Sequence, residues 1–249
     1  MDGISPTMTV APPFPGGIGV SHLRVYDTPA PDGVAGGTPH LHTVCTEAYA
    51  VIAGSGEVHT LTSSGFRVTP LEPGAFVWFS AGTIHRLVNG GGLEILVLMA
   101  NAGLPEAGDL VITFPAEIVS DAHAYALAAT LPEGDRTTAG PGMSARRRRD
   151  LAVPTFLDLV AATERGDPQP LRRFHEAAAA LVRPRIADFE KLWRDGPVAA
   201  VDLTEQQLAA LASGSSAHLS EASVHSMPVP GAERRLGCCG TLGTYVDAR

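Results

Sequence analysis

Apolar and polar residues alternate along the first half of the chain with the period of two that β-strands show. The alternation begins near Gly17 and is broken repeatedly by clusters of glycine and proline, such as those at 28–33 and 72–74. Leu93 to Met99 is instead almost continuously apolar, which is typical of a strand buried on both faces. Several short strands of this kind predict a closed or sandwich-like antiparallel β-barrel. The expected strands span 48–53, 57–61, 66–71, 75–79, 93–99 and 111–114, with hairpin turns at 54–56 and 89–92.

The hydrophobic period changes in the second half of the chain. Apolar residues recur at helical spacing over 156–163 and again over 171–193, with a break expected at Pro184. Residues 204–207 resemble a capping box, so a last helix is expected to begin there and to stop at Gly214. The sequence thus predicts a β-barrel followed by a C-terminal α-helical extension. The expected division is an N-terminal arm at 1–16, the barrel at 17–118, a linker at 119–149, the helical extension at 150–214, and a tail at 215–249 packed back on the protein.

Composition and charge exclude some partners. The 249 residues are 45% hydrophobic, which is ordinary for a globular protein with a core. A formal net charge of −8 argues against a general nucleic-acid or anionic-membrane surface, because such partners reward clustered positive charge. The run Arg146 to Arg149 is interpreted as a solvated linker, with an anionic ligand as the alternative.

The sequence also bears on localisation. Its start lacks the basic and apolar pattern of a signal peptide, and no apolar run reaches the roughly 20 residues that span a bilayer. The positions of Cys45, Cys238 and Cys239 do not predict a disulfide framework. We therefore expect a cytoplasmic protein without a membrane segment.

Three histidines and one glutamate could hold a metal ion. His40 and His42 stand two apart, so on a strand both side chains point to the same face. Glu47 has the wrong parity for that face, and the chain must turn after His42 to bring it back. His85 follows on a later strand. Imidazole suits zinc, copper, iron and nickel, and a carboxylate also tolerates manganese, so the residues do not select one metal.

These residues fall in two motifs that resemble those of the cupin family. Cupins carry G-x5-H-x-H-x(3,4)-E-x6-G and then G-x5-P-x-G-x2-H-x3-N. This chain reads His40-x-His42-x4-Glu47-x6-Gly54, and then Gly74-x5-Ser80-x-Gly82-x2-His85-x3-Asn89. It departs from the pattern at Gly33, one residue further out than the first glycine, and at Ser80, where proline is usual. The resemblance covers roughly Gly17 to Phe114.

The resemblance implies a jelly-roll-like cupin barrel, a homodimer, and one divalent metal ion per chain held by His40, His42, Glu47 and His85. Iron is favoured, with zinc, manganese or nickel as alternatives. Four protein ligands leave two positions on a six-coordinate ion for substrate, water or dioxygen. The leading hypothesis is an iron-dependent dioxygenase acting on a small organic molecule. Two alternatives stay open: a zinc-, manganese- or nickel-dependent isomerase, lyase or cyclase, and a non-catalytic small-molecule-binding or sensor barrel.

Substrate contacts are harder to assign from the sequence. Tyr49 shares a strand face with Glu47, and His59 lies on the next expected strand. Arg67 and Trp78 could reach the mouth of the barrel. These four side chains, Tyr49, His59, Arg67 and Trp78, are the candidates for substrate contact.

Overall fold

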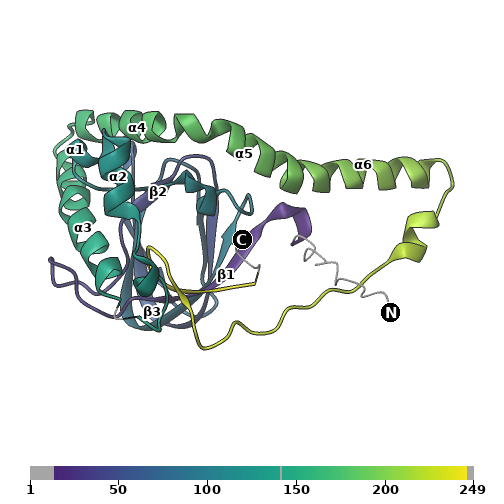
Figure 1. Cartoon of the computed structure of the whole chain (residues 1–249), viewed down its shortest axis with the longest axis horizontal. Coiled ribbons are helices and arrows are strands. Elements are labelled where there is room, and N and C mark those ends of the chain that lie inside the picture. Colours follow the sequence, from purple (N-terminus) through teal and green to yellow (C-terminus); the bar gives the residue numbers. More distant parts are fainter. Residues whose placement is uncertain (1–13, 141, 246–249) are drawn as a thin grey trace, which may run out of the picture.

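The structure is a computed structural model that describes residues 14–140 and 142–245. Nine strands in these residues form one antiparallel sheet that curls into a barrel (Figure 1). The main path of the sheet runs β4-β3-β6-β1-β9-β8, with β5 on β3 and β2 between β6 and β7. The predicted fold class, an antiparallel barrel followed by an α-helical extension, is confirmed. The strands are β1 (Gly19–Val25), β2 (His40–His42), β3 (Glu47–Thr62), β4 (Gly65–Leu71), β5 (Phe76–Phe79), β6 (Ile84–Met99), β7 (Leu110–Ile112), β8 (Arg235–Leu236) and β9 (Gly240–Thr244).

The two hairpin turns predicted at 54–56 and 89–92 are wrong, because both segments lie inside long strands. β3 and β6 run through them as antiparallel partners, with register shifts between Val51 and Gly56. Gly54 has φ +71°, and a Cβ atom there would lie 2.1 Å from the carbonyl oxygen of Gly92. The glycines therefore let the two strands bend together at close approach instead of ending them.

The helical region begins earlier than predicted. The segment 119–149, expected to be a linker, carries α2 and the first turns of α3, which begins at Met143 and includes Pro154. The last helix begins before the predicted capping box, and the Thr204 hydroxyl donates to the Ala200 carbonyl in mid-helix. A threonine satisfied in this way does not mark a helix terminus. The α-helices in the described residues are α1 (Ala116–Val119), α2 (Ala122–Ala129), α3 (Met143–Glu164), α4 (Gln169–Val182), α5 (Ile186–Trp193) and α6 (Ala199–Ala212).

The arginine run 146–149 lies within α3, so its interpretation as a solvated linker is wrong. Its first two side chains are exposed, but the Arg149 side chain is buried. The Arg149 guanidinium donates to the backbone carbonyls of Thr28, Pro29 and Gly36 at 2.7–3.2 Å. A buried cation is tolerated where its donors are satisfied. Arg149 therefore ties α3 to the loop between β1 and β2.

The buried apolar residues form two hydrophobic cores. One fills the barrel interior and includes Tyr49, and the other lies between the barrel and the helices and includes Phe156 of α3. Because side chains alternate along a strand, Leu41 enters the helix-facing core while His40 and His42 point to the opposite face. The predicted metal ligands are thus placed on the inner side of the barrel wall.

The helices form two groups in space (Figure 1). α1 to α4 cover one side of the barrel (Figure 1), and Phe189 of α5 is buried in the same helix-facing core. α6 continues the line of α4 and α5 beyond the barrel, and we call its residues 199–212 the arm. The arm buries no residue and meets the 3-10 turn Pro15–Gly17. The chain then returns to the barrel, where β9 pairs with β1. None of the helices in the described ranges has both the length and the apolar character that a bilayer crossing requires.

Candidate metal centre

The turn required between His42 and Glu47 is present. β2 ends at His42, β3 begins at Glu47, and residues 43–46 form the bend between them. His85 of β6 stands opposite His40 in the antiparallel register. One potential ligand atom from each of these four residues lies within 4.8 Å of the others, and all four residues are buried. This group, called the His-Glu cluster below, could bind one metal ion.

Each imidazole of the cluster is oriented through its Nδ1 atom. Nδ1 of His40 donates to the carbonyl of Thr38 at 2.8 Å, and Nδ1 of His85 donates to the carbonyl of Thr83 at 3.2 Å. Nδ1 of His42 is bonded instead to a carboxylate oxygen of Asp109, at 3.0 Å. An acceptor at Nδ1 selects the tautomer whose Nε2 carries a free lone pair, which is the form that binds metals.

The ligand atoms at the centre are arranged to bind a cation and do not form good hydrogen bonds with one another. Oε2 of Glu47 lies 3.1 Å from Nε2 of His85 and 3.4 Å from Nε2 of His42. Neither Glu47 Oε2 nor His85 Nε2 makes a hydrogen bond of acceptable geometry, although both atoms are buried. The four ligand atoms lie within 4.8 Å of one another, which brings them close enough to share one ion. Unpartnered buried polar atoms are costly, and a cation would satisfy both of them.

Two of these groups have lowered pKa values that favour the form which binds a metal. Burial opposes ionisation of Glu47, but the neighbouring His85, His42 and His40 outweigh it and hold the pKa of that carboxyl at about 2. Burial, with His85 and His42 nearby, lowers the pKa of His40 well below its ordinary value. Glu47 is therefore an anion and His40 a neutral imidazole near neutral pH, as metal binding requires.

The pKa of His42 is shifted in the opposite direction from that of His40. Burial would lower its pKa, but the hydrogen bond to Asp109 and the charges of Glu47 and Asp109 outweigh that effect and raise the pKa above its ordinary value of 6.5. A proton therefore competes with a metal ion for His42 more strongly than for His40.

The four proposed substrate contacts separate into one near the cluster and three away from it. Tyr49 is fully buried on the inner face of β3, its ring centroid is 6.3 Å from that of His85, and its hydroxyl has no hydrogen-bond partner. His59 bonds to Glu57 and packs on Phe66, on the side of β3 that faces α3. Arg67 and Trp78 are exposed, and Trp78 alternates with Phe79, whose ring packs on His85. The structure brings only Tyr49 to the cluster.

Sequence reasoning missed Asp109. This residue directly precedes β7, lies outside both motifs and is fully buried. Its only signal in the sequence is a single acidic residue before the strand-like run 110–114, a feature too common to single it out. Its contact with His42 joins residues 67 positions apart, which the sequence alone does not reveal.

The comparison with protein families supports the cupin resemblance of the barrel. Residues 28–100 match the family model described as cupin domain, so the barrel is a cupin domain, as its two motifs predict. The match stops before Asp109 and before the six α-helices of the described residues. No curated protein matches the chain.

Part of the chain also aligns with solved structures that are named as enzymes of different kinds. A sugar phosphate isomerase, described as putative, from Acidithiobacillus ferrooxidans is 26% identical with a TM-score of 0.27, over 33% of this chain and 49% of that one. An oxalate decarboxylase from Bacillus subtilis is 19% identical with a TM-score of 0.35, over 42% of this chain and 28% of that one. A DMSP lyase from Ruegeria pomeroyi is 21% identical with a TM-score of 0.28, over 35% and 40%. The alignments span about half or less of those chains, so the activities of those proteins are not assigned to this one.

Proposed function

We propose that this chain is a mononuclear metal-dependent enzyme acting on a small organic molecule. The observation that carries the proposal is the buried His-Glu cluster with three imidazoles oriented through Nδ1. His40, His42, Glu47 and His85 would hold one divalent ion, which when bound would supply a Lewis acid or a redox centre. Such an arrangement of partners behind the ligands is typical of sites built to hold a metal.

The residues around the cluster suggest what the protein itself contributes. Glu47 supplies the only negative charge among the four ligands, so a divalent ion would keep a net positive charge that attracts an anionic or polar substrate. The Tyr49 hydroxyl is the proposed substrate contact, because it is buried next to the cluster without a partner. Burial raises the pKa of Tyr49 far above its ordinary value, with the charge of Glu47 adding to the effect, so its hydroxyl stays protonated and can donate a hydrogen bond.

Two reaction classes belong to the proposal. The first is an iron-dependent dioxygenase, which follows the cupin resemblance of the motifs. The second is Lewis-acid chemistry with zinc, manganese or nickel, in an isomerase, lyase or cyclase. A donor set of three imidazoles and one carboxylate supports both, since all of these metals accept it. A non-catalytic binding barrel is the competing function, and metal content separates it from the other two.

The deciding experiment measures metal in protein purified without a histidine tag. We expect about one ion per chain in the wild type and in Glu57→Gln, which removes a half-exposed carboxylate from the same strand. Glu47→Gln keeps the size of the side chain but replaces the anionic oxygen, and we expect it to lose at least about 90% of the metal. Iron would direct assays to oxygen consumption, and zinc, manganese or nickel to non-redox chemistry. A wild type that stays metal-free after reconstitution would reject the enzyme proposal.

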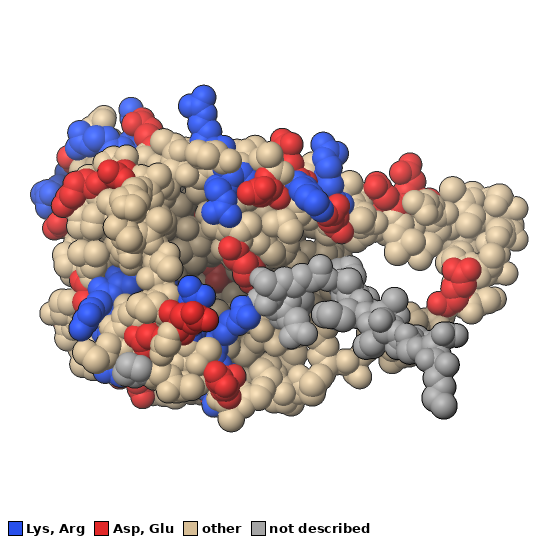
Figure 2. Space-filling view, viewed as in Figure 1, with Lys and Arg blue, Asp and Glu red and all other residues tan. Residues whose placement is uncertain are grey.

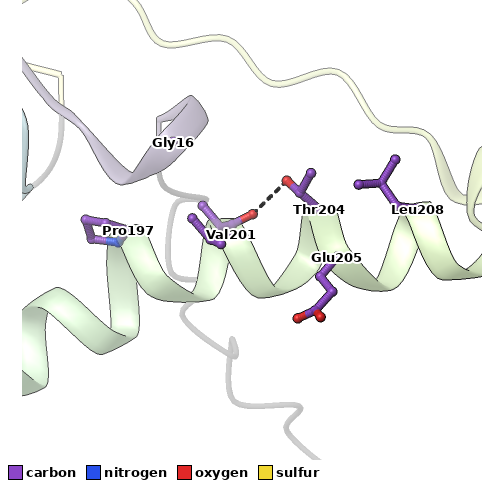
Figure 3. A pocket seen from close by; sticks show the side chains of 7 residues that line it. Gly16, Pro197, Val201, Thr204, Glu205 and Leu208 are labelled. Atoms are coloured by element: carbon purple, nitrogen blue, oxygen red, sulfur yellow. Dashed lines mark hydrogen bonds between the residues drawn. The ribbon is translucent and has the colours of Figure 1, made fainter.

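We also propose that a second copy of this chain covers the arm. A groove of about 460 Å³ lies between α6 and the turn at Gly16, and Val201, Thr204 and Leu208 line it (Figure 3). Val201 and Leu208 are 67% and 63% exposed, and Trp78, on the outer face of β5, is 69% exposed. Large apolar side chains exposed in two separate places suggest surfaces that associate. In a symmetric dimer the arm of each copy could cover the β5 face of the other.

A cytoplasmic setting is likewise part of the proposal. Cys45, Cys238 and Cys239 are free thiols, and reduced thiols are usual where glutathione and thioredoxin act. Burial raises the pKa of all three thiols, which makes them unreactive as nucleophiles. Thiol labelling of the protein in intact and in unfolded form tests this, and protection in the folded form is the expected result.

A further inference from the structure

The carboxylate of Asp109 connects the bend after β2 to one metal ligand. Its Oδ1 accepts from the backbone N–H groups of Thr43 and Val44, at 2.8 and 2.7 Å, and from the Thr43 hydroxyl at 2.6 Å. Its Oδ2 accepts from Nδ1 of His42 at 3.0 Å and from the backbone N–H of Cys45 at 3.2 Å. One buried side chain therefore holds both His42 and the bend that leads to Glu47.

The two carboxylate oxygens of Asp109 have different hydrogen-bond partners, so their positions are not equivalent. Three donors converge on Oδ1, so that position must be an acceptor. Oδ2 faces the imidazole of His42 and the backbone N–H of Cys45. Because a carboxylate has no hydrogen to give, Nδ1 of His42 must carry a proton, and in the neutral ring its Nε2 keeps a free lone pair towards Glu47.

His42 differs in this respect from the other two imidazoles of the cluster. His40 and His85 are oriented by the backbone carbonyls of Thr38 and Thr83, which no side-chain substitution removes. Only His42 relies on a side chain, and that side chain comes from a separate part of the sequence. The tautomer of this one ligand can therefore be changed by a single substitution.

We propose that Asp109 is a positioning residue of the metal centre, which fixes the Nδ1–H tautomer of His42 while it holds the bend of residues 43–45. The inference rests on the proposed function, because it assigns a role at the same site. It adds a residue outside the matched cupin segment, and it gives that residue a task that can be tested without substrate.

The sharpest test is Asp109→Asn, which conserves shape but changes one acceptor into a donor. The amide oxygen should take the place of Oδ1, since three donors converge there and only the backbone N–H of Cys45 competes for it at Oδ2, and the NH2 group should then face His42. Nδ1 of His42 becomes an acceptor, and its proton moves to Nε2, the atom that should bind the metal. We expect the metal Kd to rise about 10- to 100-fold, with the circular dichroism of the folded protein retained.

The direct readout is the tautomer of His42 in metal-free protein, measured by the 15N chemical shifts of the ring nitrogens at a pH above the titration of His42, which the same shifts report. We expect Nδ1–H in the wild type and Nε2–H in Asp109→Asn. The matched control is Thr43→Val, which removes a donor from the same carboxylate but leaves the bond to His42 in place. Its tautomer should stay Nδ1–H, and its metal Kd should stay within about threefold of the wild type.

The possible results separate this inference from the proposed function. An Nε2–H tautomer in the wild type overturns the inference without any variant, which also covers the case in which Asp109→Asn does not fold. A variant that keeps Nδ1–H and binds metal as the wild type does overturns it as well. A wild type that binds no metal, but whose tautomer switches in the variant, rejects the metal enzyme and keeps the orienting role of Asp109.

Discussion

The barrel and the arm differ in what the chain does with its apolar residues. In the barrel, Leu87 and Ile95 are fully buried, and each alternates with side chains on the opposite face of β6. In α6, none of the residues is buried, although Val201, Leu203 and Leu208 are as apolar as those of the core. The barrel is therefore stabilised by its own packing, whereas the arm presents apolar surface that the described residues leave exposed. Substitutions in the two regions should affect different properties.

The largest expected effect is on stability. Leu87→Ala should lower the free energy of unfolding by about 2–5 kcal/mol, because it leaves a cavity in a core where the side chain is fully buried. Leu203→Ala, in the arm, should change it by less than about 0.5 kcal/mol in dilute solution, since the side chain is 54% exposed. Urea unfolding of both variants provides the comparison. Equal losses would show that the arm packs as tightly as the barrel.

A second prediction concerns the connection between the helices and the barrel. Arg149→Lys should lower the free energy of unfolding by about 2–3 kcal/mol, because a lysine ammonium cannot reach the carbonyls of Thr28, Pro29 and Gly36 together. Arg147→Lys, on the exposed side of α3, is the matched control and should be close to neutral. Thermal unfolding measures both. A neutral Arg149→Lys would mean that α3 does not depend on this contact.

The site was more predictable from the sequence than the path of the chain around it. His40 and His42 share a face by strand parity alone, and the wrong parity of Glu47 requires the bend that the structure shows after His42. Both inferences use short-range geometry. Asp109 could not be found in this way, because its partners lie more than 60 positions earlier and nothing in its own surroundings marks it.

The errors in the fold also have physical causes. Glycine is common in tight turns and in the bends of long strands, so the pattern at 54–56 could not distinguish a hairpin from the bend that the close approach of Gly92 requires. The sequence predicts that the arginines of α3 are solvent-exposed, because only tertiary contacts show that Arg149 is buried. Such contacts override local patterns, and the sequence alone does not contain them in readable form.

A third prediction uses the opposite pKa shifts of two ligands in the barrel. His42 has a raised pKa and His40 a lowered one, so His42 is the first of these two to take up a proton as the pH falls. The metal Kd should rise about tenfold per pH unit below the pKa of His42, and it should be flat above it. The carboxyl of Glu47, with a pKa of about 2, should add no second step near pH 4.5. Calorimetric metal titrations at pH values above and below the pKa of His42 measure how Kd changes with pH. A Kd independent of pH would contradict the assignment.

The smallest effect on stability, but the clearest on association, is expected in the arm. Val201 and Leu208 are seven positions apart on one face of α6, and both line the groove by Gly16 (Figure 3). The double variant Val201→Asp/Leu208→Asp should therefore shift the mass in solution from two chains to one, because it places charge on a surface that a second copy would bury. Metal content should not change. Leu127→Asp on α2, where the side chain is 69% exposed outside the arm, should leave the dimer intact. A wild type that remains a single chain at every concentration would show that the arm binds something other than its own copy.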